Sequence, residues 1–526
     1  MACSDTGFFV GDFIGSSLGL ALMIRTEKFI SSNYLKLFYV LVKNGGYPSP
    51  KFLIVLLLPV FIGVCFLTPT VQAQGGSVAS GSGETERPKW KLLRFEEDWS
   101  ILKNSPKSKR THLFDPIKYI PLSADGKLWV SFGGHARARL ENWSDFSFNS
   151  ANTDSFLVTR VILHSDIHYG EHFRLFAEGK SAHVTSRNLP GNSRTLDMDE
   201  FELQQAFVDF RFPLGDMGTI TLRPGRRELS KGKQRLVSPL PWANAFRHWD
   251  GVSAILETHG WNVEGFWTHF TPVEKYGFND PDSGNLFSGI YGTGKTWGGV
   301  GMDLYWLLKD HDGRTFNGTT GDEERHTLGG RVWGKVPQFH IDYDLEGAYQ
   351  FGELSTADID AFMIATQVGY KRGDWFWQPR VFLGFDYASG DDQAGGDVGT
   401  FNQLFPLGHA YLGFMDFVGR QNSVDFSHGV TLKPIKKLAV TLTGHNFWRA
   451  DTNDALYSAG AAVERAGSAG TSDDIGYEVD LIAKYKFNRH LAGLFGYSHF
   501  YAGDFIGQSG TKEDMDFIYL QGIFTF

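Results

Sequence analysis

The chain has 526 residues and a mild formal net charge of −9. That length exceeds the roughly 100–200 residues of one ordinary soluble domain, and the charge offers no basic footprint, which excludes nucleic acid as a partner. Aromatic residues make up 15% of the sequence, and glycine occurs 62 times. This composition, without long helical periodicity, favours a β protein, and membrane β-barrels concentrate aromatic residues in two interfacial girdles.

A secretory signal is predicted in the N-terminal region. Lys51 precedes an apolar run over residues 52–67, and the small-residue pattern Val71-Gln72-Ala73 follows it. A basic start, an apolar core and a small residue at the cut are typical of a signal peptide. The alternative is a membrane anchor, but the run is shorter than the roughly 20 residues of a helical span. We therefore predict a signal peptide at 51–73, cleaved after Ala73.

The rest of the N-terminal region is assigned by position and composition. We predict that residues 1–50 are an upstream over-reading or an extended leader, because a signal peptide begins near the terminus of a chain. Residues 74–124 form a periplasmic N-terminal linker, which is rich in Gly and Ser over 74–86. Cys3 and Cys65 both precede the cleavage site, so the mature chain has neither a disulfide framework nor a cysteine-based metal site.

From about residue 127 onward, apolar and polar side chains alternate along the sequence, which predicts β-strands. In the first segment the apolar face holds Val130, Phe132, Ala136, Ala138 and Leu140, and the polar face holds Ser131, His135, Arg137, Arg139 and Glu141. The same pattern recurs near residues 160, 345 and 480. In a soluble sandwich the charged face meets outside water, whereas in a membrane barrel it lines a water-filled lumen.

Three features favour the membrane barrel. The apolar faces are rich in aromatic residues, a secretory signal is present, and the chain ends in an alternating pattern. That pattern consists of Ile518, Leu520, Gly522, Phe524 and Phe526, and it resembles the terminal signal that the outer-membrane barrel assembly machinery reads. We predict that residues 125–526 form an all-β fold, a single closed antiparallel transmembrane β-barrel in the bacterial outer membrane.

The strand count follows from the turns, since such barrels have short periplasmic turns and longer outer loops. Short turns are expected at 169–171, 213–218, 259–260, 335–338, 371–373, 434–437 and 488–490. These turns alternate correctly only if a further strand lies over 286–291, with 292–295 as its turn. The prediction is therefore about eighteen strands, with sixteen as the fallback.

Several motifs resemble the alginate export family, in order and in spacing, over about residues 125–526. They are GRREL at 225–229, Trp242 with Asn244 and Arg247, RHTLGGR at 325–331, EGAYQFG at 346–352, SGD at 389–391 and FNQLFPLGHAYLG at 401–413. The resemblance implies an eighteen-stranded barrel that secretes a uronic-acid polymer. One departure is the bulk of Lys231 and Lys233 beside Gly232.

No cofactor is predicted, and the export function and the C-terminal pattern imply several partners. The implied partners are an anionic polysaccharide such as alginate, outer-membrane lipid, the barrel assembly machinery, which contacts Phe526, and a periplasmic export scaffold. A barrel of eighteen strands encloses its own channel, so a monomer suffices.

Arginine suits a polyuronate, because its planar fork accepts a carboxylate bidentately and keeps its charge. Strand parity and position predict these residues along the substrate pathway: Arg137, Arg139, Arg160, Arg174, Arg211, Arg223, Arg226, Arg331 and Arg449, with Glu141, Asp166 and Glu346. One hypothesis is that the connection after Arg227 folds inward and adds a basic constriction. The alternative for any single arginine is that it pairs with an inward carboxylate and only braces the lumen.

Other functions are weighed against a passive export pore. His164, Asp166 and His168 share a strand face, but parity alone produces that spacing, so no metal site is predicted. A general diffusion porin for small anions or sugar acids stays open. A barrel enzyme is the remote alternative: Ser427 and His428 are adjacent and face opposite sides of a strand, so no catalytic residue is predicted. A structural or adhesive barrel would not need so many lumen arginines.

Overall fold

The computed structural model describes residues 87–105, 110, 112–296 and 299–526. The predicted leader, the signal peptide and the first part of the linker lie outside these residues. All elements below belong to one compact unit, Val78–Phe526. Within the described ranges, no helix combines the length and the apolar content that crossing a membrane requires.

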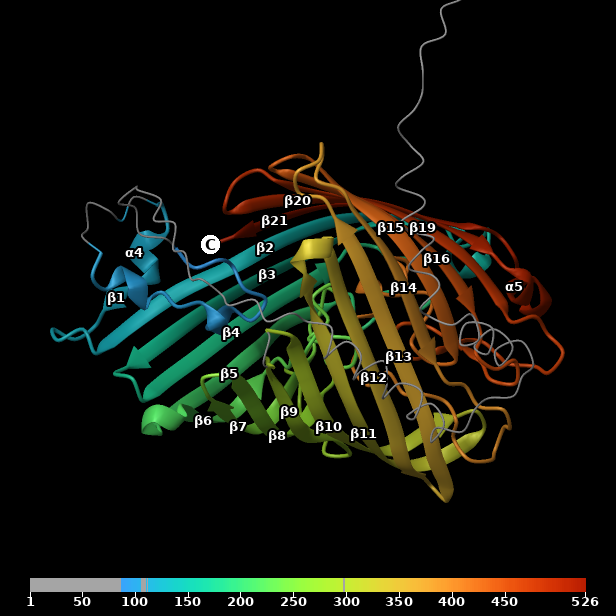
Figure 1. Ribbon diagram of the computed structural model, residues 1–526, viewed down its shortest axis with the longest axis horizontal. Helices are drawn as coiled ribbons and strands as arrows, with labels where there is room; N and C mark the ends of the chain where they lie inside the picture. Colours follow the sequence, from blue (N-terminus) through green and yellow to red (C-terminus); the bar gives the residue numbers. More distant parts are fainter. Residues whose placement is uncertain (1–86, 106–109, 111, 297–298) are drawn as a thin grey trace, which may run out of the picture. The chain divides into compact units, whose positions relative to one another are not determined.

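The described residues form one large antiparallel sheet that closes on itself. The sheet contains nineteen strands, of which β1 (Ile120–Pro121) pairs only with β2 (Leu128–Ser144). The other eighteen form a ring, because β2 pairs on one side with β3 (Asp154–Tyr169) and on the other with the last strand, β21 (Met515–Thr525). Figure 1 shows these first and last strands side by side. The prediction of a closed all-β barrel of eighteen strands is confirmed.

The remaining strands of the ring follow in chain order. They are β4 (Phe173–Val184), β5 (Asp199–Pro213), β6 (Thr219–Arg227), β7 (His248–Glu257), β8 (Trp261–Thr271), β9 (Asn285–Lys295), β10 (Gly301–Phe316), β11 (Thr319–Val336), β12 (Ile341–Leu354), β13 (Ala357–Lys371), β14 (Arg380–Ala388), β15 (Ser423–Ile435), β16 (Leu438–Trp448), β19 (Asp474–Lys486) and β20 (Leu491–Ala502).

Short elements complete the fold. The two short strands of the connection after β16 are β17 (Leu456–Tyr457) and β18 (Val463–Arg465), and the two short helices are α4 (Asp115–Lys118) and α5 (Asp504–Ser509). The 3₁₀ turns are η1 (Arg94–Glu96), η2 (Ser100–Leu102), η4 (Phe146–Phe148), η5 (Gly215–Met217), η6 (Pro337–Phe339) and η7 (Gly408–Ala410).

The two ends of the barrel differ. We call the end that carries the turns 170–172 and 487–490 the short-turn end, and the opposite one the long-loop end. The short turns fall where the sequence predicts them, with two corrections. The predicted turn at 292–295 is wrong, because β9 continues to Lys295, and the turn at 371–373 extends to residue 379.

Glycine explains why β9 runs further than expected. Gly294 lies under the Trp261 ring of β8, and a Cβ at that position would approach the ring to 2.5 Å. The glycine therefore admits a neighbouring aromatic side chain and does not end the strand.

The outer face of the ring is apolar, as a lipid-facing surface must be. Leu140, Leu163 and Leu328 are more than half exposed, at 51%, 56% and 57%. Arg137 and Arg139, which alternate with Leu140 on β2, are each only 4% exposed. The charged face of β2 therefore lies inside the ring.

Two long connections fill part of that interior. Loop A (228–247) joins β6 to β7, and loop B (389–422) joins β14 to β15. Residues 241–244 of loop A contact β2 and β3, whereas Arg235 contacts β12 on the opposite wall. Loop A therefore crosses the lumen. This places the connection after Arg227 inside the barrel, as hypothesised.

Loops A and B hold each other through the main chain. Ser238 N–H donates to the Phe405 carbonyl at 2.8 Å, and Phe405 N–H donates to the Leu236 carbonyl at 2.9 Å. Around this bridge, inward side chains of the wall pack on both loops in an apolar cluster that includes Trp249 and Phe287. The lumen is thus filled at this level by a hydrophobic core, and its open space lies elsewhere.

Candidate functional site

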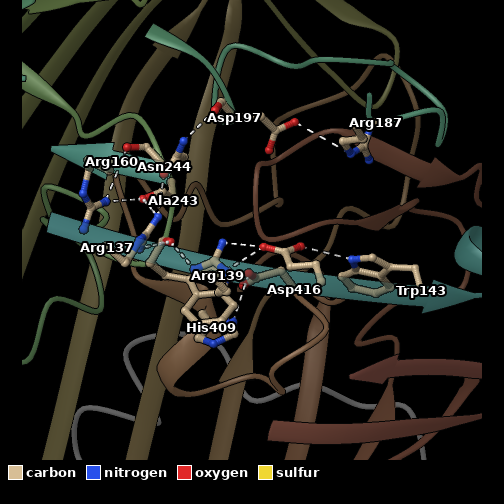
Figure 2. A network of polar contacts seen from close by, with 12 residues as sticks. Arg137, Arg139, Trp143, Arg160, Arg187, Asp197, Ala243, Asn244, His409 and Asp416 are labelled. Carbon is tan, nitrogen blue, oxygen red and sulfur yellow. Dashed lines mark hydrogen bonds and ion pairs between the residues drawn. The ribbon is translucent and has the colours of Figure 1, made fainter. Parts of the chain in front are cut away.

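Three predicted pathway arginines hold loop A. Arg137 donates to the Trp242 carbonyl at 3.0 Å and to Asn244 Oδ1 at 2.9 Å. Arg160 donates to the Ala243 carbonyl at 2.7 Å, and Arg139 donates to the Trp242 carbonyl at 2.9 Å. Figure 2 shows Arg137 and Arg160 pointing at Ala243 and Asn244. Most of these donors face neutral oxygens of loop A, so the side chains anchor a loop.

Carboxyl and amide groups complete this anchor. Glu141 accepts from Arg139 at 2.7 Å and from the Trp143 indole N–H at 3.2 Å. The Asn244 side-chain amide donates to the carbonyls of Thr159 at 3.0 Å and Asp197 at 2.9 Å. A buried amide with this many partners is fixed in place, which makes residues 241–244 a rigid part of the lumen.

On the opposite wall, loop A is held by carboxylates. Arg235 donates to Asp344 at 2.7 Å and to Glu346 at 2.8 Å. Arg331 pairs with Asp344 at 3.1 Å and also with Asp303. Because Arg235 and Arg331 share Asp344, the wall carries an extended ion-pair network at mid-lumen.

One large cavity, the charged chamber, lies between loop A and the wall from β3 to β11. Its volume is about 690 Å³. The wall and loop residues with charged side chains that line it are Arg174, Arg211, Arg223, Arg227, Lys231 and Arg331, and Glu228, Glu257, Glu264 and Asp303. Among the described residues of wall and loop, six cations thus face four carboxylates.

The cations of the charged chamber are held to different degrees. Arg223 forms a bidentate pair with Asp209 at 2.5 and 2.8 Å, and Arg174 forms one with Asp166 at 2.7 and 2.6 Å. Arg211 lies 3.9 Å from Glu257, and its side chain is 45% exposed. Arg211 is therefore the cation that is most open to solvent at the mouth of this chamber.

A second cavity, the hydroxyl chamber, lies on the side of β13 to β19. Its volume is about 270 Å³. Its polar lining is dominated by hydroxyl groups, those of Thr366, Tyr411, Ser427, Thr431, Thr441 and Thr443, with Arg235, Arg380 and Lys484 as cations and Asp386 and Asp425 as carboxylates. The two chambers are separated by loop A and by η7 of loop B.

Four of the twelve predicted pathway residues, Arg174, Arg211, Arg223 and Arg331, line the charged chamber. The other eight line neither chamber: Arg137, Arg139, Arg160, Arg226, Arg449, Glu141, Asp166 and Glu346. Arg226 pairs with Asp250 at 2.7 Å and with Glu202. Arg449 donates to the main chain of the connection 449–473, including the Ser472 carbonyl at 2.6 Å. Whether any of the predicted residues contacts a substrate stays a prediction.

The sequence reading missed Arg420, which is fully buried in loop B and forms a bidentate pair with Asp386 at 2.9 and 2.6 Å. It also missed Arg380, which pairs with Asp342 at 2.5 Å. Arg420 lies next to Gln421, within a stretch that resembles the family, so the motif was a usable signal. Among the described residues, no group of three or more His, Cys, Asp or Glu is arranged to hold a metal.

A pair of carboxylates ties loop B to the connection 449–473. Asp454 accepts from Thr400 Oγ1 at 2.6 Å, from Tyr457 OH at 2.7 Å and from the Asp391 N–H at 3.1 Å. Burial, reinforced by the charge of Asp454, raises the pKa of Asp391 to about 6. This junction lies at the long-loop end, outside the strands.

A closed antiparallel ring with an apolar outer face and charged internal chambers is the architecture of an outer-membrane pore. The Alginate export family matches residues 128–519, and the chain belongs to this family. The comparison with curated proteins finds no match to this sequence.

Solved structures share the fold. Acinetobacter baumannii OccAB1 is 13% identical, covers 78% of this chain and 99% of its own, and has a TM-score of 0.51. Pseudomonas aeruginosa OccK8 (OprE) is 10% identical, covers 76% of this chain and 98% of its own, and has a TM-score of 0.50. At these identities the likeness concerns the fold alone.

Proposed function

We propose that this protein exports an anionic polysaccharide, a polyuronate such as alginate, by passive diffusion through the charged chamber. The observation that carries the proposal is the lining of that chamber, where six cations of wall and loop face four carboxylates. This formal excess of positive charge belongs to wall and loop alone, because Glu96, Glu97 and Asp98 of the N-terminal segment also line the chamber. Where the wall and loop are accessible, their excess charge attracts a chain of carboxylates. Transport also needs weak, repeated contacts, because tight binding would stop the polymer.

The contacts between polymer and arginines are weak because the arginines are already paired with carboxylates of the wall. Arg174 and Arg223 already share their guanidinium groups with Asp166 and Asp209. An arriving uronate therefore competes with a resident carboxylate and gains only part of a full bidentate pair. Each contact is weak, and a polymer meets several of them in succession.

The remaining parts of the proposal concern export. The signal peptide is cleaved after Ala73, and the barrel assembly machinery reads the C-terminal strand that ends in Phe526. A periplasmic scaffold delivers the polymer to the short-turn end, since short turns face the periplasm in such barrels. The protein acts as a monomer, because one ring encloses both chambers.

A second candidate is a diffusion pore for small anions or sugar acids. It is favoured by the apolar packing of loops A and B, which fills the lumen between the chambers and the long-loop end. A small solute needs less displacement of these loops than a polymer does. The two candidates therefore differ in the size of the solute that blocks the current.

The test is a planar bilayer containing the chain from Gln74 onward, with the reversal potential measured in a salt gradient and oligouronates added. We expect anion selectivity and a current that is blocked by polyuronate and not by neutral dextran. Arg211→Gln should weaken both effects, because it removes a cation that lines the chamber. Arg372→Gln is the matched control, since Arg372 lies on the turn after β13 and pairs with Asp374 at 2.6 Å, away from both chambers.

Block by monomeric uronate as strong as block by the polymer would favour the small-anion pore. Cation selectivity, or a polymer that leaves the current unchanged, would contradict the arginine-lined pathway.

A further inference from the structure

The described part of the N-terminal region, from residue 87 onward, packs on the short-turn end of the barrel. The Trp90 indole N–H donates to the Arg489 carbonyl at 2.7 Å, and Arg489 donates to the Pro88 carbonyl at 2.6 Å. Arg94 donates to the Phe526 carbonyl at 3.1 Å and to the Gly134 carbonyl at 3.3 Å. The segment is thus clamped to the β19–β20 turn and to the closing strands of the ring.

At Phe95 the N-terminal segment enters the charged chamber. Its ring lies 5.0 Å from the Phe207 ring, edge to face, and it is 8% exposed. Arg174 donates to the Phe95 carbonyl at 2.5 Å, and the Arg223 guanidinium lies 4.6 Å from the centre of the Phe95 ring. Two cations of the proposed pathway therefore also contact this segment.

The residues that follow Phe95 bring negative charge. Glu96, Glu97 and Asp98 line the chamber together with its wall. Glu97 pairs with Arg94 at 2.6 Å, whereas the Glu96 carboxylate makes no hydrogen bond or ion pair with the residues that the structure describes. The three carboxylates reverse the formal balance of the described lining, from six cations and four anions to six cations and seven anions.

We propose that residues 93–98 are an internal acidic lid, which occupies the charged chamber and competes there with the carboxylates of the transported polymer. The inference rests on the proposed function, and it assigns the lid to the same chamber. Phe95 is the apolar plug that seats the lid between Phe176 and Phe207. The Glu96 carboxylate lines the same chamber as Arg223 and Lys231 and interacts with their charges, as a uronate carboxylate in the chamber would.

The lid is inside the chamber in this structure, so a polymer binds only after displacing it. The apparent affinity of the polymer is then reduced by the fraction of molecules in which the lid is open. Removing the lid should raise conductance, increase anion selectivity and lower the polyuronate concentration that halves the current. A change of about tenfold in that concentration corresponds to a lid that is open one time in ten.

The main variant is Phe95→Asp, which removes the aromatic ring that packs between Phe176 and Phe207. Leu92→Asp is its matched control, because Leu92 lies on the same segment, is 39% exposed and does not line the chamber. Both are made in the chain from Gln74 onward, and conductance, reversal potential and block by oligouronates are measured in planar bilayers. We expect all three quantities to change in Phe95→Asp and none in Leu92→Asp.

A second pair tests the charge alone. Glu96→Gln should increase anion selectivity and polymer block with little change in conductance. Glu171→Gln, on the exposed turn between β3 and β4, is its control.

The outcomes separate the lid from the transport function. Higher conductance and anion selectivity in Phe95→Asp, without block by polyuronate in any variant, would support the lid and contradict the polyuronate substrate. Equal block of the parent chain, Phe95→Asp and Glu96→Gln would overturn the lid and leave the export function intact. No change in conductance, selectivity or block in either variant would likewise overturn it.

Discussion

The charged chamber and the hydroxyl chamber lie inside the same ring, yet they differ in size and in chemistry. The first has about 690 Å³ and a lining of paired charges, and the second has about 270 Å³ and a lining of hydroxyl groups. Strand parity places polar side chains inside the barrel in both. The difference arises from loops A and B, which decide what each inward side chain meets.

The comparison also separates two kinds of arginine. Arg137 and Arg160 bind loop carbonyls and are almost completely buried, at 4% and 3% exposure. Arg211 and Arg223 face a cavity and are paired with carboxylates. The same residue type on the same face of a strand therefore anchors a loop or lines a chamber, according to which loop packs against it.

The largest expected effect is on stability and comes from breaking an ion pair beside the charged chamber. Arg223→Gln leaves the carboxylate of Asp209, which is 1% exposed, without its bidentate partner. Loss of one member of a buried pair costs about 3–5 kcal/mol of stability. The free energy of unfolding, measured by urea titration of the refolded barrel in lipid vesicles, should show that loss.

The control for this variant lies in the hydroxyl chamber. Thr443→Val removes one hydroxyl that lines it and should cost about 1 kcal/mol or less. Arg223→Gln combined with Asp209→Asn should recover most of the stability. Equal losses in Arg223→Gln and Thr443→Val would show that the two linings do not differ energetically.

The next effect concerns the fit of loop A against the charged chamber. Gly232 has φ +52°, and a Cβ there would lie within 3.1 Å of Asp303 and 3.2 Å of Arg331. Gly232→Val combines a strained backbone, worth about 1–3 kcal/mol, with a steric clash, so loop A should shift and the conductance should change. Gly265→Ala is the control, since a Cβ at Gly265 has no atom within 4 Å. An unchanged conductance in Gly232→Val would show that loop A does not pack tightly against the wall at this position.

A smaller effect compares single cations. Arg211→Gln removes an exposed cation of the charged chamber, and Lys484→Gln removes one of the hydroxyl chamber. Neither should change stability by more than about 0.5 kcal/mol. The reversal potential should move further in Arg211→Gln than in Lys484→Gln. The opposite order would assign the anion pathway to the hydroxyl chamber.

The smallest effect is a pH dependence of loop B. Burial raises the pKa of Asp391 to about 6 from 3.8, so the folded loop prefers the protonated carboxyl. The stabilisation is complete below pH 3.8 and is lost as the pH rises through about 6. For this single buried group the change is on the order of 1 kcal/mol.

Current fluctuations from loop B should therefore be fewer at pH 4.5 than at pH 7.5. Asp391→Asn should remove this difference, and Asp392→Asn, at the exposed neighbouring position, should keep it. Fluctuations that depend on pH equally in both variants would refute the role of Asp391.

The sequence predicted the ring well and the interior only in part. Alternation over β2 placed Arg137 and Arg139 inside, because the period of two fixes which face a side chain takes. It could not show that both arginines bind loop A, since those contacts join residues more than one hundred positions apart. The length of β9 was missed because Gly292 and Gly294 were read as turn residues, whereas Trp261 packs over them.

The site was hardest to predict where segments distant in sequence meet. The contact between Arg94 and Phe526 spans 432 positions, and no local sequence pattern predicts it. The stretch 401–413 marked loop B as special, but its packing inside the lumen depends on the partner side chains of β7 and β9. The two-residue alternation therefore predicts the strands of such a barrel, whereas the packing of its internal loops is seen only in the tertiary structure.

The clamp of Arg94 has one more consequence, which concerns assembly. Its two acceptors are the carbonyls of Gly134, in the first strand of the ring, and of Phe526, which follows the last strand. These carbonyls come together only when β2 and β21 have paired. A barrel with an open seam lacks this pair of acceptors for Arg94. Protection of the Trp90–Glu97 region from proteases thus reports a finished barrel, and its cleavage reports a stalled one.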